Sequence, residues 1–363
     1  EKNVTYPAII LRQDILYFKG IVSGEKLKLG SQYKRKKFGA DGFYWTPDTY
    51  EHRVAIYSVI KTNLFNYETN FSGRIEHRVI NPRSGDTFFS NLNPNDIRSR
   101  NFTLLSGGLS LLKERGNLSN YYQFLITSRA PSIEDLFSDG PHLGNYAYEI
   151  GDPNLEQENT LGFENTISIF NSNYKIKLTS YLNYSPNYHL SEKMGDGYTP
   201  GADWIEWGSG PIGWLYKYRL MGLEALKYGF EPHFTIDFES SKINCNASII
   251  RGINMTDNNP LSYMPPDHIR IQYEKNVLFL TNTFEAVLVS SQNRLGEFET
   301  KTDGYSLFNY FGSYTISKNE KTHKIIFQLK NILNETYYNH LSKIKMIMPE
   351  AGRSFNINYR IYF

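Results

Sequence analysis

The last nine residues of the chain read FNINYRIYF, from Phe355 to Phe363. Every second side chain in this stretch is apolar, namely Phe355, Ile357, Tyr359, Ile361 and Phe363. The residues between them are polar, except that Tyr362 blurs the pattern. A side-chain period of two predicts a β-strand with one face toward an apolar phase and the other toward water. Because about nine residues are enough for a tilted strand to cross a membrane, the stretch predicts an outer-membrane β-barrel.

The composition agrees with a barrel wall that separates lipid from water. Of the 363 residues, 21% are charged and 40% hydrophobic, yet 15% are aromatic, with 28 Tyr and 23 Phe. Tyrosine suits the membrane interface, and a barrel strand alternates between lipid and a wet interior. The net charge of +2 gives no electrostatic reason to expect a nucleic-acid partner.

Cysteine content and apolar runs exclude several other classes of protein. Cys245 is the single cysteine, so neither an intramolecular disulfide nor a thiolate metal cluster can form within the chain. We interpret it as a thiol packed in a strand. No apolar run reaches the roughly 18 residues of a membrane-spanning helix. The first residues do not read as an export signal, so we expect that the natural N-terminus lies further upstream.

The spacing of turn residues predicts hairpins with short turns at one end and long loops at the other. Asn, Gly, Pro and charged residues mark short turns at residues 63–66, 113–117, 171–173, 229–232, 274–276 and 318–321. Longer connections are predicted at residues 81–100, 131–158, 190–214, 253–267, 295–304 and 336–353. This asymmetry is typical of bacterial outer-membrane barrels. The pattern gives roughly fifteen strands, an odd count that does not close the usual even-numbered barrel.

Alternation also predicts which side chains face the barrel interior. In the hairpin near residues 50–80, the apolar side chains share one face. Arg53, Arg74, Glu76 and Arg78 fall on the other face, where charges can pair with one another. We therefore expect these four side chains in the lumen.

The chain shows no motif of a known catalytic or nucleotide-binding site, so we do not expect an enzyme or a bound cofactor. The loop of residues 190–214 is the richest candidate surface, since its aromatic rings and carboxylates suit a ligand. Its ligand-binding candidates are Tyr198, Trp204 and Trp207. The alternative, that these aromatics pack as a local core of the loop, stays open.

Four segments in order resemble those of the TonB-dependent outer-membrane receptors. SRAPSIEDLF at residues 128–137 is similar to the family's RAPS-x-E-x-L segment, and GDPNLEQE at residues 151–158 to its G-(D/N)-P-x-L-x-x-E element. NPLSYMPP at residues 259–266 looks like its PL-P-x-x-PP loop. LKNILNETYY at residues 329–338 resembles V-x-N-L-x-(D/N)-x-x-Y, with GRSF at residues 352–355 like its GR-x-(F/V) entry into the last strand.

The resemblance implies a large antiparallel transmembrane β-barrel with 22 strands and a plug in its lumen. Residues 1–363 would be one domain, the C-terminal part of that barrel with about 15 of the 22 strands; the plug, the first strands and the TonB-contacting box would be absent. The implied location is the bacterial outer membrane. The implied partners are outer-membrane lipid, the inner-membrane TonB complex acting through the absent plug, and a ligand bound by the outer loops and plug.

Two segments point more weakly to the family's metal-uptake receptors. Residues 292–305 and 340–345 look like those of receptors assigned to zinc or to iron chelates, such as siderophores or haem. His142 falls in a loop that these receptors share, and with Asp139 and Glu149 it is a candidate metal site. The alternative is an ordinary polar surface histidine.

The predicted function is therefore active uptake of a scarce nutrient, a metal ion or a metal chelate, across the outer membrane. A passive diffusion porin, which needs no plug, is the alternative within the same fold class. A secreted soluble β-protein that binds carbohydrate would instead have to bury aromatics such as Tyr359 and Phe363 in a core. The transported substrate cannot be named from the sequence.

Overall fold

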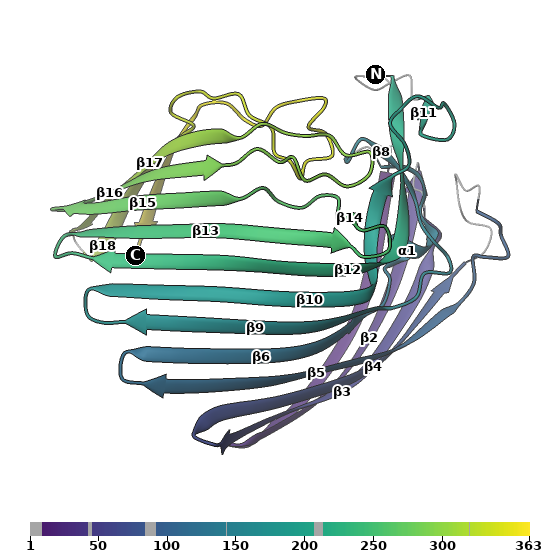
Figure 1. The fold of residues 1–363 in the computed structure, drawn as a ribbon, viewed down its shortest axis with the longest axis horizontal. Coiled ribbons are helices and arrows are strands. Elements are labelled where there is room, and N and C mark those ends of the chain that lie inside the picture. Colours follow the sequence, from purple (N-terminus) through teal and green to yellow (C-terminus); the bar gives the residue numbers. More distant parts are fainter. Residues whose placement is uncertain (1–8, 43–45, 84–91, 143, 207–212, 319) are drawn as a thin grey trace.

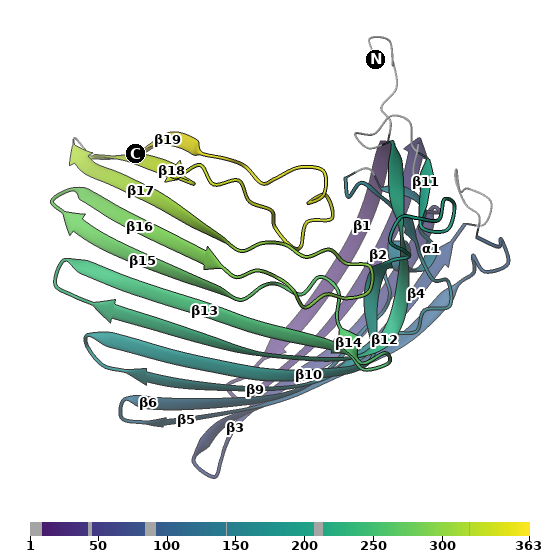
Figure 2. The ribbon, with the colours of Figure 1, turned by 45° about the horizontal axis from the view of Figure 1, so that its top comes forward.

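The computed structural model describes residues 9–42, 46–83, 92–142, 144–206, 213–318 and 320–363. Its regular structure is one curved, almost entirely antiparallel sheet (Figures 1 and 2). Within the described residues, fifteen strands have nine or more residues. They are β1 (Ile9–Ser23), β2 (Leu27–Gly42), β3 (Thr49–Leu64), β4 (Tyr67–Pro82), β5 (Arg100–Arg115), β6 (Leu118–Arg129), β9 (Glu158–Phe170), β10 (Tyr174–Lys193), β12 (Trp214–Asp237), β13 (Ser241–Asn254), β15 (His268–Val277), β16 (Leu280–Val289), β17 (Tyr305–Lys318), β18 (Lys321–Lys330) and β19 (Ser354–Tyr362).

Four shorter strands lie in the long connections: β7 (Asp139–His142), β8 (Ala147–Ile150), β11 (Trp204–Glu206) and β14 (Asn259–Pro260). The predicted all-β antiparallel class and the count of about fifteen wall strands are thus confirmed. The described residues also contain one helix, α1 (Ile133–Phe137). No helix of the described residues is both long and apolar enough to span a membrane.

Each long strand pairs with the next long strand along the chain, from β1 with β2 to β18 with β19. In the part of the chain that the structure describes, β1 and β19 each pair on one side only, and Figure 2 draws these two strands apart. The tight turns lie on one rim of the sheet and the long connections gather on the other (Figure 1). The predicted asymmetry of turns and loops is therefore present.

Two of the predicted turns are misplaced. Residues 229–232 lie inside β12, which continues to Asp237, and residues 274–276 belong to β15. Pro232 lies opposite Leu178 of β10 and interrupts only the pairing toward β13, where Phe230 and His233 remain in register. Proline lacks an N–H for the ladder, so it signals a turn in the sequence, although here it interrupts the hydrogen bonds on one side only.

The register separates the two faces of the sheet as the alternation predicted. In β19, Phe355, Ile357 and Tyr359 lie directly opposite Leu329, Phe327 and Ile325 of β18. On the first strands, Ile56, Ile75 and Leu105 lie opposite one another across β3, β4 and β5. These apolar side chains are strongly exposed, with Ile56 at 60%. We call this side of the sheet the outer face.

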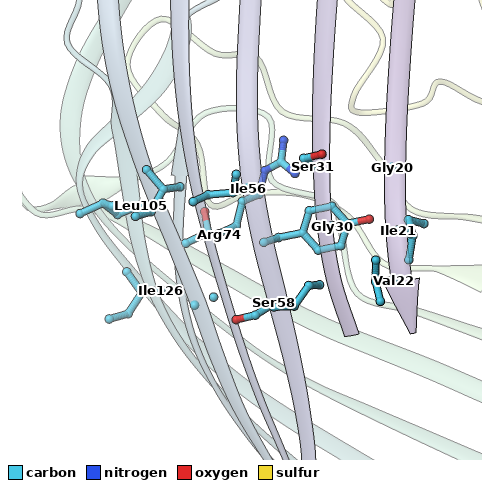
Figure 3. Close-up of a pocket in the computed structure, with 16 residues that line it drawn as sticks. Gly20, Ile21, Val22, Gly30, Ser31, Ile56, Ser58, Arg74, Leu105 and Ile126 are labelled. Carbon is cyan, nitrogen blue, oxygen red and sulfur yellow. The ribbon is translucent and has the colours of Figure 1, made fainter. Parts of the chain in front are cut away.

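A hollow of about 1,060 Å³ over β1–β6 interrupts this surface (Figure 3). Ser58, Gly73 and Gly107 lie directly opposite one another across β3, β4 and β5, so no long side chain fills the space beside Ile56 and Ile75. The hollow follows from this row of small residues.

The other side, the inner face, is covered in part by α1 and the chain that follows it. Ile133, Leu136 and Phe137 pack with Phe38, Ile80, Phe102, Leu104 and Leu155 in one buried cluster. The Ser132 hydroxyl accepts a hydrogen bond from the Asp135 amide, and the Asp135 carboxylate accepts one from the Ser132 amide, which together cap the helix. The segment with the RAPS motif is therefore a core element of the inner face.

Gly151 connects this helix to the next motif. A Cβ at Gly151 would lie 2.8 Å from the Asp135 carbonyl oxygen and from the Leu136 carbonyl carbon. The amides of Gly151 and Asp152 donate to the carbonyls of Ser138 and Asp135. The first two motifs thus form one packed unit that only glycine permits.

Replacing Phe137 with alanine tests this packing. Phe137 is fully buried, so the cavity left behind should lower the free energy of opening of α1 by about 3–5 kcal/mol. Hydrogen exchange at the amides of Leu136 and Ser138, which bond to Ser132 and Glu134, measures this opening. Phe279→Ala, at an exposed position in the turn between β15 and β16, should change these rates little. Equal rates in both variants would contradict the packing.

Candidate functional site

The long connections converge on one end of the sheet, which we call the loop end. β7 and β8 form a hairpin, and β8 then pairs in parallel with β12, from Ala147 opposite Tyr216 to Ile150 opposite Arg219. The connections after β14, β16 and β18 meet this hairpin. Residues almost two hundred positions apart therefore come into contact, as the 3.5 Å distance between Lys343 Nζ and Glu149 Oε1 shows.

A small cavity lies where these segments meet. It is lined by four tyrosines, three lysines and several loop residues: Tyr146, Tyr216, Tyr218, Tyr263, Lys193, Lys343, Lys345, Phe298, Glu299, Thr300, Ser342, Met346 and Ile347. Its volume is about 50 Å³. A pocket for a drug-sized ligand measures about 300–1,000 Å³, so this cavity can hold one group of a ligand but not a whole chelate.

The lysines of the cavity lie against the tyrosine rings. Lys193 Nζ is 3.9 Å from the centre of the Tyr216 ring, and Lys343 Nζ is 4.5 Å from that of Tyr218. Tyr218 and Tyr263 pack with ring centres 6.5 Å apart. Burial, together with the neighbouring Tyr218 and the carboxylates of Glu299 and Glu192, raises the pKa of Tyr263, so its hydroxyl stays protonated. The surface therefore offers ammonium groups and phenol hydroxyls, which suit a negatively charged ligand group.

A buried cluster of charged and polar side chains joins the loops at this cavity. His340 Nε2 lies 2.9 Å from Glu299 Oε1, and the two side chains are 0% and 3% exposed. Glu299 also accepts hydrogen bonds from the amides of Tyr263 and Gly296. Lys345 Nζ donates to the Thr300 carbonyl and lies 3.3 Å from His340 Nδ1. One carboxylate thus joins three connections, and we call Glu299, His340 and Lys345 the loop clasp.

The charge state of the loop clasp follows from its surroundings. Burial raises the pKa of Glu299, but the His340 side chain and the amides of Gly296 and Tyr263 outweigh burial and lower it below 4.5. Burial lowers the pKa of Lys345, and the Glu299 carboxylate opposes this. At neutral pH Glu299 is therefore a carboxylate that holds the loops together.

The predicted metal ligands are only partly brought together. His142 Nδ1 lies 3.0 Å from Glu149 Oε2, so this pair is in contact. Asp139 lies on the opposite face of the β7–β8 hairpin, where its carboxylate accepts a hydrogen bond from the Tyr148 hydroxyl. Successive side chains of a strand point to opposite faces, and positions 139 and 142 differ in parity, so Asp139 and His142 lie on opposite faces.

Within the described residues, no group of three or more His, Cys, Asp or Glu side chains is placed to hold a metal ion. The structure therefore places His142 and Glu149 together and Asp139 apart from them. A metal-binding role for His142 and Glu149 stays a prediction.

The three aromatic residues predicted to bind a ligand lie in different surroundings. Tyr198 is 86% exposed at the loop end, whereas Trp204 in β11 packs on Trp214 with ring centres 5.9 Å apart. Trp207 lies outside the described residues. Trp204 therefore agrees with the alternative of a local aromatic core, and Tyr198 is accessible to a ligand. Ligand binding by these residues stays a prediction.

Sequence reasoning missed the residues that line the cavity. Tyr216 and Tyr218 stand on alternate positions of β12, and Tyr263 follows the PL pair of a recognised motif. The concentration of tyrosine next to a family motif was the available signal. Their contact with Lys343 depends on how distant connections fold together, which no local pattern reports.

The fold resembles that of several solved structures. The copper transporter OprC matches with a TM-score of 0.75 at 16% identity, over 96% of this chain and 56% of that one. The FrpB iron transporter from Neisseria meningitidis (F3-3 variant) matches with a TM-score of 0.64 at 12% identity, over 98% and 55%. The siderophore receptor PirA from Acinetobacter baumannii matches with a TM-score of 0.64 at 11% identity, over 98% and 63%.

The chain has the fold of these transporters and receptors. It spans little more than half of their length, between 55% and 63%. No known family model matches the sequence. The likeness therefore establishes the fold, which is shared with a copper transporter, an iron transporter and a siderophore receptor.

The loop clasp predicts how the loop end responds to acid. Because the folded pKa of Glu299 lies below its ordinary value of 4.5, Glu299 stabilises the loops above about pH 4.5, and this contribution is lost as the pH falls through the folded value. Protease cleavage within residues 331–353 should therefore accelerate below pH 4.5. The Glu299→Gln variant should be cleaved by the protease roughly tenfold faster than the unmodified protein already at pH 7. Its cleavage rate should then change little further as the pH falls.

Glu297→Gln is the matched control, because Glu297 is exposed in the same connection. It should keep the slow cleavage at pH 7 and the acid response of the unmodified protein. Equal cleavage of both variants at pH 7 would show that the clasp does not hold the loops.

Proposed function

We propose that this chain is part of a TonB-dependent outer-membrane receptor that takes up a scarce nutrient, a metal ion or a metal chelate, into a bacterial cell. The observation that carries the proposal is the fold, which follows copper, iron and siderophore transporters or receptors over 96–98% of this chain. The four sequence motifs support it independently, since they occur in the order of that family.

We further propose that residues 1–363 are one domain, the C-terminal part of a barrel of about 22 strands. The chain covers only 55–63% of the matched structures, which supports its being part of a larger barrel. So do the edges of β1 and β19, each paired on one side only within the described residues. In lipid every backbone polar group needs a partner, so a working barrel requires further strands between these edges. A plug within the lumen would complete the receptor and contact the TonB complex.

The loop end is the proposed region of first ligand contact. Lys193 and Lys343 lie against tyrosine rings there, and Tyr198 is exposed beside them on the same rim. Ammonium and phenol groups together favour an anionic, aromatic-rich or chelated ligand over a bare cation. Metal contact by His142 and Glu149 is part of the proposal, and Lys343 Nζ lies 3.5 Å from the same Glu149 carboxylate. We assign no catalytic role to any residue.

Growth under metal starvation tests the function. A strain without the gene should grow poorly under one of three conditions, iron, zinc or copper limitation, and the intact gene should restore growth. In that condition Lys343→Ala should raise the half-saturating concentration of uptake about tenfold, because it removes one charge-assisted contact. Lys275→Ala is the control, since Lys275 contacts Ser240 at the opposite rim. Normal growth of the deletion strain under all three conditions would contradict metal uptake.

Conductance separates this function from a diffusion porin. The complete protein in a planar lipid bilayer should show no large steady conductance, because a plug would fill the lumen. A large steady conductance would instead favour the porin.

A further inference from the structure

The inner face of the first strands carries a row of cations that the sheet itself does not neutralise. Lys34 of β2 lies directly opposite Arg53 of β3, and Arg53 lies directly opposite Arg78 of β4. Like charges directly opposite each other on neighbouring strands destabilise the pairing. The prediction that Arg53, Arg74, Glu76 and Arg78 share this face is confirmed by the same register.

Three carboxylates neutralise part of this positive charge. Glu51, which is 1% exposed, contacts Arg53 and lies 2.9 Å from Arg78 Nη2. Glu76 contacts Arg74, and Glu158 lies 2.7 Å from Arg129. Lys34 has no ion pair with any described residue. The four arginines alone thus outnumber the three carboxylates, and Lys34 adds a further positive charge on the same face.

The four arginines converge on one cavity of about 170 Å³. Its lining consists of Arg53, Arg74, Glu76, Arg78, Leu104, Ser106, Ser128, Arg129 and Ala130. A water molecule occupies about 30 Å³, so the cavity has room for roughly five or six waters or one small anion. It is too small for a whole chelate of the kind proposed as cargo.

Arg78 is the buried cation of this cavity. Its side chain is 9% exposed, yet its Nε has no hydrogen-bond partner among the described residues. Nη2 is engaged by Glu51, and Nη1 reaches the Ala130 carbonyl only at 3.4 Å. A buried donor without a partner destabilises the fold, and an acceptor bound in the cavity would offset that cost.

We propose that this cavity binds a small oxyanion that carries two or more negative charges. Guanidinium groups present paired N–H donors that match the oxygens of a carboxylate or a phosphate. Glu76 also lines the cavity, but its charge is engaged by Arg74. The site goes beyond the proposed uptake function, because it lies on the inner wall below α1 and shares no lining residue with the loop-end cavity.

Calorimetric titration of the complete protein in detergent tests the site, with citrate in one arm and inorganic phosphate in the other. Arg129→Gln is the test variant, since Arg129 lines the cavity and its loss does not leave a deeply buried carboxylate without a partner. This variant should weaken binding of the preferred anion about tenfold, because one charge-assisted contact is lost. Added salt should weaken it further.

Arg270→Gln is the matched control. Arg270 lies on the inner face of β15 beside Glu285, away from this cavity, so its loss should leave the affinity unchanged. Saturable binding of citrate but not of phosphate would assign the site to carboxylates. Saturable binding of phosphate but not of citrate would assign it to phosphates. No saturable binding of either anion would overturn the proposal. So would equal affinities of the Arg129→Gln variant and the unmodified protein, or an equal loss of affinity with Arg270→Gln.

Discussion

The constraint on which the structure depends is the side-chain period of two along a continuous backbone ladder. Each long strand pairs with its neighbour, so one register fixes which side chains stand on the outer face and which on the inner face. The exposed Ile56 and Ile75 and the ionic Glu51, Arg53 and Arg78 come from the same two strands, β3 and β4. A shift of one residue would place arginine among the isoleucines, so the register is strongly determined.

Most of the wall could be predicted because this period is written directly in the sequence. The strand at Phe355–Phe363, the count of about fifteen long strands and the inner position of Arg53, Arg74, Glu76 and Arg78 all follow from alternation. The errors lie where a local signal has two meanings. Pro232 signals a turn in the sequence, but β12 continues through it because only one side of the ladder loses a hydrogen bond.

The recognised motifs could be located but not explained from the sequence. In the structure they are loop anchors. Ser132 and Asp135 cap α1, and Gly151 lets the backbone approach that helix closely. Asn331 adopts a positive φ of 51° after β18, and its side chain bonds both the amide and the carbonyl of Glu335. These roles are structural, which explains how proteins with different cargo can share the same short strings.

The candidate site was predicted less well for a related reason. Local parity separates Asp139 from His142, whereas sequence proximity had suggested that they act together. The cavity tyrosines and Lys343 meet only because the connections after β14, β16 and β18 fold onto the β7–β8 hairpin. The loop clasp of Glu299, His340 and Lys345 fixes that arrangement. Contacts of this kind depend on tertiary packing and leave no periodic trace in the sequence.

A nitroxide scan along β15 in lipid vesicles tests the central claim, the division into an apolar outer face and a polar inner face. Cys245→Ala provides the background, and single cysteines at positions 269 to 274 carry the label. Oxygen, which concentrates in lipid, should relax the labels at Ile269, Ile271 and Tyr273. A water-soluble relaxing agent should instead reach Arg270, Gln272 and Glu274. Equal accessibility at odd and even positions would contradict the account.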